Sequence, residues 1–144
     1  MYRIRSATKD DIPAIVHLQA QSLKETLNVA PTHTIEEDFD YYSNVVVVRD
    51  VIFVAEADGH VVGYVGFRKD WVDHLRVDSR YHGRGIGRAL LETAKQRYPY
   101  LQLWCFQHIP AREFYRRQGF VEIEHTDGRN NDEKLPDIRM EWRR

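Results

Sequence analysis

A run of glycine and basic residues near the middle of the chain has the composition of an anion-binding loop. It reads Tyr81-His-Gly-Arg-Gly-Ile-Gly-Arg88 and follows an aliphatic stretch that ends at Val77. Glycines let a bulky ligand approach the main chain, and successive N–H groups at the start of a helix attract an anion. Arg84 and Arg88 add donors that suit phosphate oxygens. The run predicts a phosphate cradle, and a tight turn without a ligand is the alternative.

The spacing of the glycines excludes two common phosphate-binding motifs. In the dinucleotide pattern G-x-G-x-x-G, the last glycine position is Arg88 when counted from Gly83 and Leu90 when counted from Gly85. The triphosphate-binding pattern fails as well, because the chain contains no Gly-Lys-Ser or Gly-Lys-Thr. A different phosphate-bearing ligand is therefore expected.

The segments around this loop predict the elements that position it. Alternating apolar residues and turn signals predict strands at 2–5, 51–57, 60–67, 71–77, 101–106, 120–124 and 137–142. Capping residues and helical spacing predict helices from Thr8 to about 27, from Thr34 with Phe39, Tyr42 and Val46 on one face, at 85–97 and at 110–118. Residues 28–31 break the first helix, and 45–48 fit a helix or a strand equally well. The pattern predicts one α+β domain over 1–144, with a mostly antiparallel sheet between about four helices.

Two motifs in this order resemble those of the GNAT superfamily of N-acetyltransferases. The first is Leu75-Arg-Val77, followed by His82-Gly-Arg-Gly-Ile-Gly-Arg-Ala-Leu-Leu91. The second is His108-Ile-Pro-Ala-Arg-Glu-Phe-Tyr-Arg-Arg-Gln-Gly-Phe120. The sequence departs from the family pattern at His82, where arginine or glutamine is usual, and at His108, where asparagine is usual. The resemblance extends over nearly the whole chain.

The resemblance implies a fold, a donor and a set of contacts. The fold would be the three-layer GNAT fold, and the acyl donor would be acetyl-CoA without a metal. The main chain of Leu75 and Val77 would hold the pantetheine arm. The pyrophosphate would lie on the loop residues His82, Gly83, Arg84, Gly85, Ile86, Gly87 and Arg88. The acceptor would be the primary amine of a small molecule or a peptide, and a homodimer is a family-level expectation.

Tyr115 occupies the position of the tyrosine that often acts as general acid in this family. Amine attack on a thioester expels a thiolate, and a phenol with a pKa near 10 can protonate that sulfur. The alternative is that Phe114 and Tyr115 both serve as core packing. Neighbouring residues on a helix point about 100° apart, which predicts that the two rings do not face the same core.

The general base is open between Asp73, His74 and water. Deprotonating an alkylamine costs roughly 4 kcal/mol at pH 7.5, so a base on the strand before Leu75 is useful. Strand alternation predicts that only one of the two side chains faces the ligand, and both can equally be surface residues. Cys105 is expected to be a buried strand residue rather than a nucleophile, which favours direct transfer.

The remaining features limit the classes of function. The 21 basic and 22 acidic residues disfavour nucleic-acid binding, and the chain lacks a bilayer-spanning apolar run or an apolar signal core, so a cytoplasmic location is expected. Acids in the loop 126–137 (Asp127, Asp132, Glu133 and Asp137) and at 36–40 either attract a cationic acceptor or are solvated. A non-catalytic acyl-CoA sensor is the rival of the enzyme, and a module for another phosphate ligand is the third alternative.

Overall fold

The computed structural model describes residues 1–27 and 33–144, so the predicted break at 28–31 lies outside the described residues. One seven-stranded sheet has the order β1-β2-β3-β4-β5-β7-β6. Its strands are β1 Tyr2–Ser6, β2 Val51–Ala57, β3 His60–Arg68, β4 Trp71–Val77, β5 Tyr100–Phe106, β6 Val121–His125 and β7 Asp137–Arg143. All neighbouring pairs are antiparallel except β4 with β5. The predicted α+β class is confirmed.

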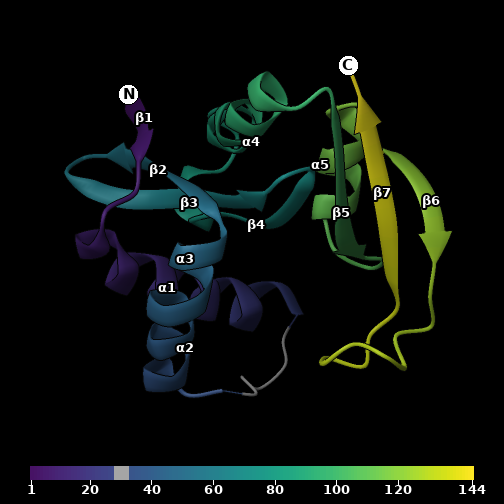
Figure 1. Ribbon diagram of the computed structural model, residues 1–144, viewed down its shortest axis with the longest axis horizontal. Coiled ribbons are helices and arrows are strands. Elements are labelled where there is room, and N and C mark those ends of the chain that lie inside the picture. Colours follow the sequence, from purple (N-terminus) through teal and green to yellow (C-terminus); the bar gives the residue numbers. More distant parts are fainter. Residues whose placement is uncertain (28–32) are drawn as a thin grey trace.

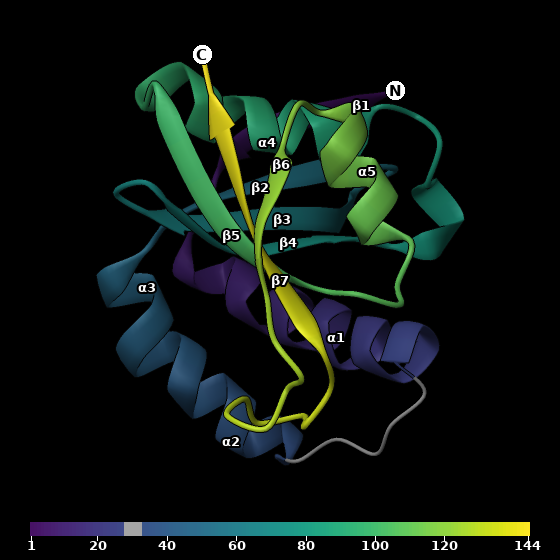
Figure 2. The same cartoon turned by 90° about the vertical axis from the view of Figure 1, so that its right-hand side faces the viewer.

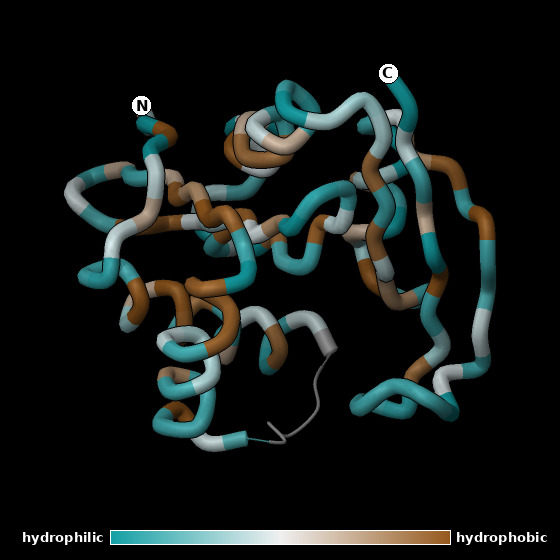
Figure 3. The backbone as a smooth tube through the Cα atoms, viewed as in Figure 1, coloured by the Kyte–Doolittle hydropathy of each residue, from teal (hydrophilic) through white to brown (hydrophobic). Residues whose placement is uncertain are grey.

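Helices cover both faces of the sheet (Figures 1 and 2). They are α1 Ile12–Ser22, α2 Ile35–Tyr41, the short α3 Val47–Arg49, α4 Ile86–Arg97 and α5 Ala111–Arg117. Single turns of other helix types extend them at Lys9–Asp11, Leu23–Leu27 and Tyr42–Val46, and a separate turn at Ser79–Tyr81 precedes the glycine loop. One apolar cluster packs under α4 and α5, and a second packs between the sheet, α1 and the turn before α3. The apolar residues accordingly gather between the layers (Figure 3).

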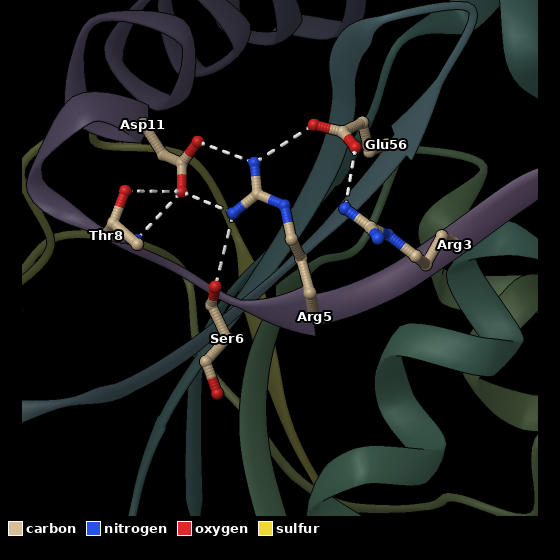
Figure 4. Close-up of polar contacts among 6 residues, drawn as sticks. All are labelled: Arg3, Arg5, Ser6, Thr8, Asp11 and Glu56. Carbon is tan, nitrogen blue, oxygen red and sulfur yellow. Dashed lines mark hydrogen bonds and ion pairs between the residues drawn. The ribbon is translucent and has the colours of Figure 1, made fainter.

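An ion-pair network fixes the entry from β1 into α1 (Figure 4). The Arg5 guanidinium donates to both oxygens of Asp11, at 2.8 and 2.9 Å, and to Glu56 of β2 at 3.1 Å. Asp11 also accepts the main-chain N–H of Thr8 at 2.8 Å. Asp11 is buried, and a buried carboxylate is stable only with such partners. The network holds α1 against the sheet.

The segment from Thr34 to Arg49 is helical throughout. Thr34 caps α2 by accepting the N–H of Glu37 at 3.1 Å, and the Glu37 carboxylate accepts the N–H of Thr34 in return. The ambiguous valines at 45–48 therefore belong to helical turns. Tyr42 and Val46 are buried, whereas Phe39, predicted on the same face, is 40% exposed.

Strands β4 and β5 diverge. Their parallel ladder contains one residue pair, Trp71 with Gln102, whereas β3 pairs with β4 along nearly its whole length. Figure 1 shows β5 running steeply across the end of β4. The side of β4 that faces β5 therefore lacks strand hydrogen bonds beyond Trp71, and that edge ends at the glycine loop.

Candidate active site

The glycine loop forms the start of α4, immediately after the end of β4. Gly83 and Gly85 have φ angles of +78° and +83°, and Gly85 is the residue that precedes the first turn of α4. A Cβ atom on Gly83 would have no neighbour within 4 Å, so its surroundings are open. Positive φ angles turn successive N–H groups to one side of the chain, which makes an anion-binding concavity. The structure gives this loop the geometry of a phosphate cradle.

Two residues of the predicted cradle have packing roles. The Ile86 side chain is 2% exposed in the core beneath α4, so it offers a ligand only its main chain. Gly87 faces α5, where a Cβ atom would lie 3.2 Å from Cζ of Phe114. The absence of a side chain at Gly87 lets α4, at the end of the first motif, approach α5 of the second motif. The two motifs, distant in sequence, are thus in contact.

The basic side chains of the loop are exposed. Arg84 lies over the ring of Tyr81, with its guanidinium carbon 4.8 Å from the ring centre. Within the described residues, neither Arg84 nor Arg88 forms an ion pair with an acid. Both guanidinium groups are therefore available to an anion at the start of α4.

The main-chain carbonyls of Leu75 and Val77, the residues predicted to contact the pantetheine arm, form hydrogen bonds with side chains of this protein. The Leu75 carbonyl accepts a bond from Nη1 of Arg76 at 3.0 Å. The Val77 carbonyl lies 2.8 Å from Nε2 of His82. His82, which departs from the family pattern, is thus a contact of the strand end in this structure. A ligand that uses these carbonyls must share them with these side chains or displace them.

Tyr115 is a buried residue of α5. Its ring centre lies 5.4 Å from that of Phe114 and 5.6 Å from that of Phe120. Phe114 and Tyr115 contact the same apolar cluster, so the prediction that they would face apart is wrong: α5 packs against both α4 and β5, and this surrounds more than one side of the helix. Burial raises the pKa of the Tyr115 phenol, which stays protonated across the physiological range.

Asp73 and His74 lie on the same side of β4, contrary to the alternation prediction. Gly66 of β3 pairs with His74 and Phe67 pairs with Val72, so Asp73 is an extra residue that interrupts the register. Such a bulge reverses the alternation of side chains locally. The Asp73 carboxylate meets Arg68 at 3.0 Å, and His74 contacts Tyr42.

The electrostatic environment separates the two candidate bases. Burial and the neighbouring Asp50 carboxyl raise the pKa of Asp73 to about 6. Burial, with the charge of Arg76 second, lowers the pKa of His74 to about 4. Within the described residues, His74 Nε2 and Asp50 Oδ2 are buried without a hydrogen bond. His74 is therefore neutral near pH 7, whereas Asp73 is the acid with a pKa suited to proton transfer.

Sequence reasoning missed the buried polar residues around His74. The hydroxyl groups of Tyr42 and Tyr64 lie 2.9 Å apart, and the Tyr42 hydroxyl lies 3.4 Å from Nδ1 of His74. Tyr42 and Tyr64 were predictable only as apolar members of a helix face and a strand. The missed signal is the tyrosine hydroxyl itself, because a buried hydroxyl requires a partner.

The loop between β6 and β7 uses part of its acid content internally. Asp137 accepts hydrogen bonds from the Thr126 hydroxyl and from the Asn131 amide, the latter at 3.2 Å. Asp127 pairs with Arg129 at 3.0 Å. Two of the four acids considered for acceptor attraction therefore hold the loop together.

Cys105 is buried in β5, as predicted. Burial raises the pKa of its thiol to about 12, so the nucleophilic thiolate is scarce at neutral pH. In the ranges 1–27 and 33–144, no group of three or more histidine, cysteine, aspartate or glutamate side chains is placed to hold a metal ion. Each helix of the same ranges is too short or too polar to cross a bilayer.

Comparison with known proteins agrees with this geometry. A family model described as acetyltransferase (GNAT) domain matches residues 49–122. The peptidyl-lysine N-acetyltransferase YiaC of Escherichia coli is 29% identical, covering 96% of this chain and 95% of that protein. A ribosomal-protein-alanine N-acetyltransferase from Brucella melitensis is 26% identical with a TM-score of 0.74, over 99% of both chains.

A structure with bound coenzyme A has the same fold. The PaiA N-acetyltransferase from Thermoplasma acidophilum, in complex with coenzyme A, superposes with a TM-score of 0.79 at 20% identity, over 100% of this chain and 99% of that one. The family match includes β4, the glycine loop and the whole of α5. The chain therefore belongs to the GNAT superfamily and is an acyl-CoA-dependent acetyltransferase.

Proposed function

We propose that this protein transfers the acetyl group of acetyl-CoA directly to a primary amine, with Tyr115 as the general acid. The observation that carries the donor assignment is the loop at the start of α4, where two glycines with positive φ follow a strand edge without strand hydrogen bonds. The pyrophosphate binds the main chain of 83–88 with Arg84 and Arg88. The pantetheine arm lies along the main chain of Leu75 and Val77.

Tyr115 has the protonation state that this role requires. Its buried phenol carries a proton at neutral pH because burial raises its pKa. As the thioester bond breaks, the amine nitrogen gains the acetyl group and the departing sulfur takes the phenolic proton. The relatives support an amine acceptor, because the names of two of them specify peptidyl-lysine and a ribosomal-protein alanine.

Asp73 is the side chain that we propose as proton acceptor for the amine, directly or through water. Its pKa of about 6 leaves it mostly ionised at pH 7.5, and its neighbours Arg49 and Arg68 balance the charge. His74 is less suited as a base, since a pKa of about 4 makes its protonated form unfavourable.

Calorimetric titration with acetyl-CoA tests the donor site. We expect binding by the wild type and a strong loss of affinity in Gly85→Val, because a branched side chain obstructs the approach of phosphate to the main chain. Gly59→Val is a matched control: Gly59 has a φ of +79° and an added Cβ atom would have no neighbour within 4 Å, but it lies in the β2–β3 turn. Equal affinity in the two folded variants would refute the cradle.

A thiol-release assay with a panel of primary amines tests the transfer. Acetyl-dependent release of coenzyme A in the presence of amine supports the enzyme. Binding of acetyl-CoA without turnover on any amine would instead favour the acyl-CoA sensor. Absence of binding at millimolar acetyl-CoA would contradict both.

A further inference from the structure

The face of the sheet under α1 and α2 contains a cluster of polar side chains that the reaction proposed above does not use. We call Tyr42, Tyr64, His74 and Arg76 the polar cluster. Tyr42 and Tyr64 share a hydrogen bond at 2.9 Å, and the His74 ring centre lies 5.4 Å from that of Tyr42 and 6.3 Å from that of Tyr64. Two hydroxyls and a neutral imidazole thus lie together inside the protein.

Arg76 is the only charged member of the polar cluster. Its side chain is half-buried, and none of the acids in the described residues forms an ion pair with it. Its Nε is buried without a hydrogen bond, and its Nη1 is bound only to the Leu75 carbonyl. Partial burial of a cation without a counter-charge is unfavourable. This guanidinium therefore has unused capacity for an anion.

Asp38 supplies the opposite charge from α2. It is half-buried while Glu36, Glu37 and Asp40 of the same helix are exposed, so it is the acid of α2 that turns inward. Its charge acts on Tyr42 and Tyr64 together, as the charge of Arg76 does. Asp38 lies four residues, about one helical turn, before Tyr42, and none of the described contacts pairs it with Arg76.

The position of Arg76 connects this cluster with the acyl donor. Arg76 lies between Leu75 and Val77, and its charge also acts on Tyr115 and Cys105. If the pantetheine arm replaces Arg76 at the Leu75 carbonyl, the Arg76 guanidinium is free to bind an anion.

We propose that Arg76 binds a carboxylate of the acceptor while Asp38 attracts its ammonium group, so that the acceptor is a free amino acid. A zwitterion matches a fixed cation and a fixed anion separated by neutral hydrogen-bonding groups. An internal lysine of a protein lacks the carboxylate. This inference rests on the proposed acetyl transfer and specifies its acceptor.

Steady-state kinetics with matched acceptors tests the proposal. Each free amino acid is compared with its amide, and kcat/KM is measured for the wild type, Arg76→Gln, Arg76→Lys and the control Arg143→Gln, an exposed strand arginine. We expect the ratio of acid to amide to be about 10- to 100-fold higher in the wild type than in Arg76→Gln. Arg76→Lys should restore part of the ratio, and Arg143→Gln should leave it unchanged. Comparing the acid-to-amide ratio of a variant with that of the wild type cancels the difference in amine basicity between the acid and the amide.

The outcomes separate this inference from the proposed function. Asp38→Asn should raise the KM of the free amino acid without changing the Kd of acetyl-CoA measured by calorimetry. Turnover that is best on an internal lysine of an end-blocked peptide, or an acid-to-amide ratio that Arg76→Gln leaves unchanged, would overturn the inference and retain acetyl transfer. If Arg76→Gln does not fold, Arg76→Lys still decides, because its acid-to-amide ratio should be lower than that of the wild type. Absence of turnover on every amine would contradict the proposed function itself.

Discussion

His74 shows how a single half-buried residue makes the stability of the protein depend on pH. Its pKa falls to about 4 in the folded protein, against about 6.5 for an exposed histidine. The folded state therefore favours the neutral ring. This contribution is fully present above pH 6.5 and is lost as the pH falls from 6.5 to about 4, because the unfolded chain binds the proton first.

We expect His74→Gln to flatten the acid side of the stability profile. The free energy of unfolding of the variant should fall by up to about 3 kcal/mol less than that of the wild type between pH 6.5 and 4. Asp73 acts in the opposite sense, since its raised pKa of about 6 gives stability that is lost as pH rises from 3.8 to 6. Asp73 remains in both proteins, so urea unfolding of the pair isolates His74. If the free energies of unfolding of the two proteins changed in parallel with pH, the His74 ring would not be the source of this pH dependence.

Tyr115→Phe tests the general acid at the scale of one hydroxyl. The variant retains the buried ring and its contacts with Phe114 and Phe120, so acetyl-CoA affinity should stay constant. We expect kcat to fall by about 10² to 10⁴-fold. In the wild type, kcat should show no decline around pH 10, because burial raises the phenol pKa. A variant with full kcat at every pH would remove Tyr115 from the reaction.

At the scale of elements, local patterns predicted the strands and helices well. The Asp58-Gly59 turn and the apolar alternation on either side predicted the β2–β3 hairpin because both signals act within a few residues. The bulge at Asp73 was not predictable in this way. It depends on the pairing of β4 with β3, which has no local sequence signal, and it changed which side chains share a face. The exposure of Phe39 was not predictable for a related reason, since periodicity does not say how wide a buried helix face is.

The β6–β7 loop contains acids that were predicted either to attract a cationic acceptor or to be solvated, and a substitution can test the first alternative. Gly128 has a φ of +84°, and a Cβ there would lie 2.3 Å from the Leu135 carbonyl group. Gly128→Ala must therefore displace the loop. We expect a several-fold higher KM for the acceptor and an unchanged Kd for acetyl-CoA. Gly59→Ala is the control, because it introduces the same backbone strain at a turn without a clash. Equal effects on both substrates would place the loop away from the acceptor.

At the scale of the whole molecule, the sheet consists of two halves. Strands β1 to β4 form one, and β5, β7 and β6 form the other, with Trp71–Gln102 as the pair that joins their ladders. The glycine loop follows the end of β4, whose edge toward β5 lacks strand pairing beyond Trp71. The sequence predicted the strands of both halves, but not how far β4 and β5 pair, because strand pairing depends on the assembled sheet.

Acetyl-CoA should act as a bridge between these halves. A ligand at 100 times its Kd stabilises the folded state by about 2.7 kcal/mol, which corresponds to a rise in Tm of roughly 8 °C for a domain of this size. In hydrogen exchange, the amides of Leu75 and Val77 should become protected, because the pantetheine arm supplies the partners that β5 does not. The amides of β2, already paired on both sides with β1 and β3, should change only with global stability. Protection confined to 83–88 would mean that the cradle binds the phosphates while the arm lies elsewhere, and the Leu75 and Val77 assignments would then be wrong.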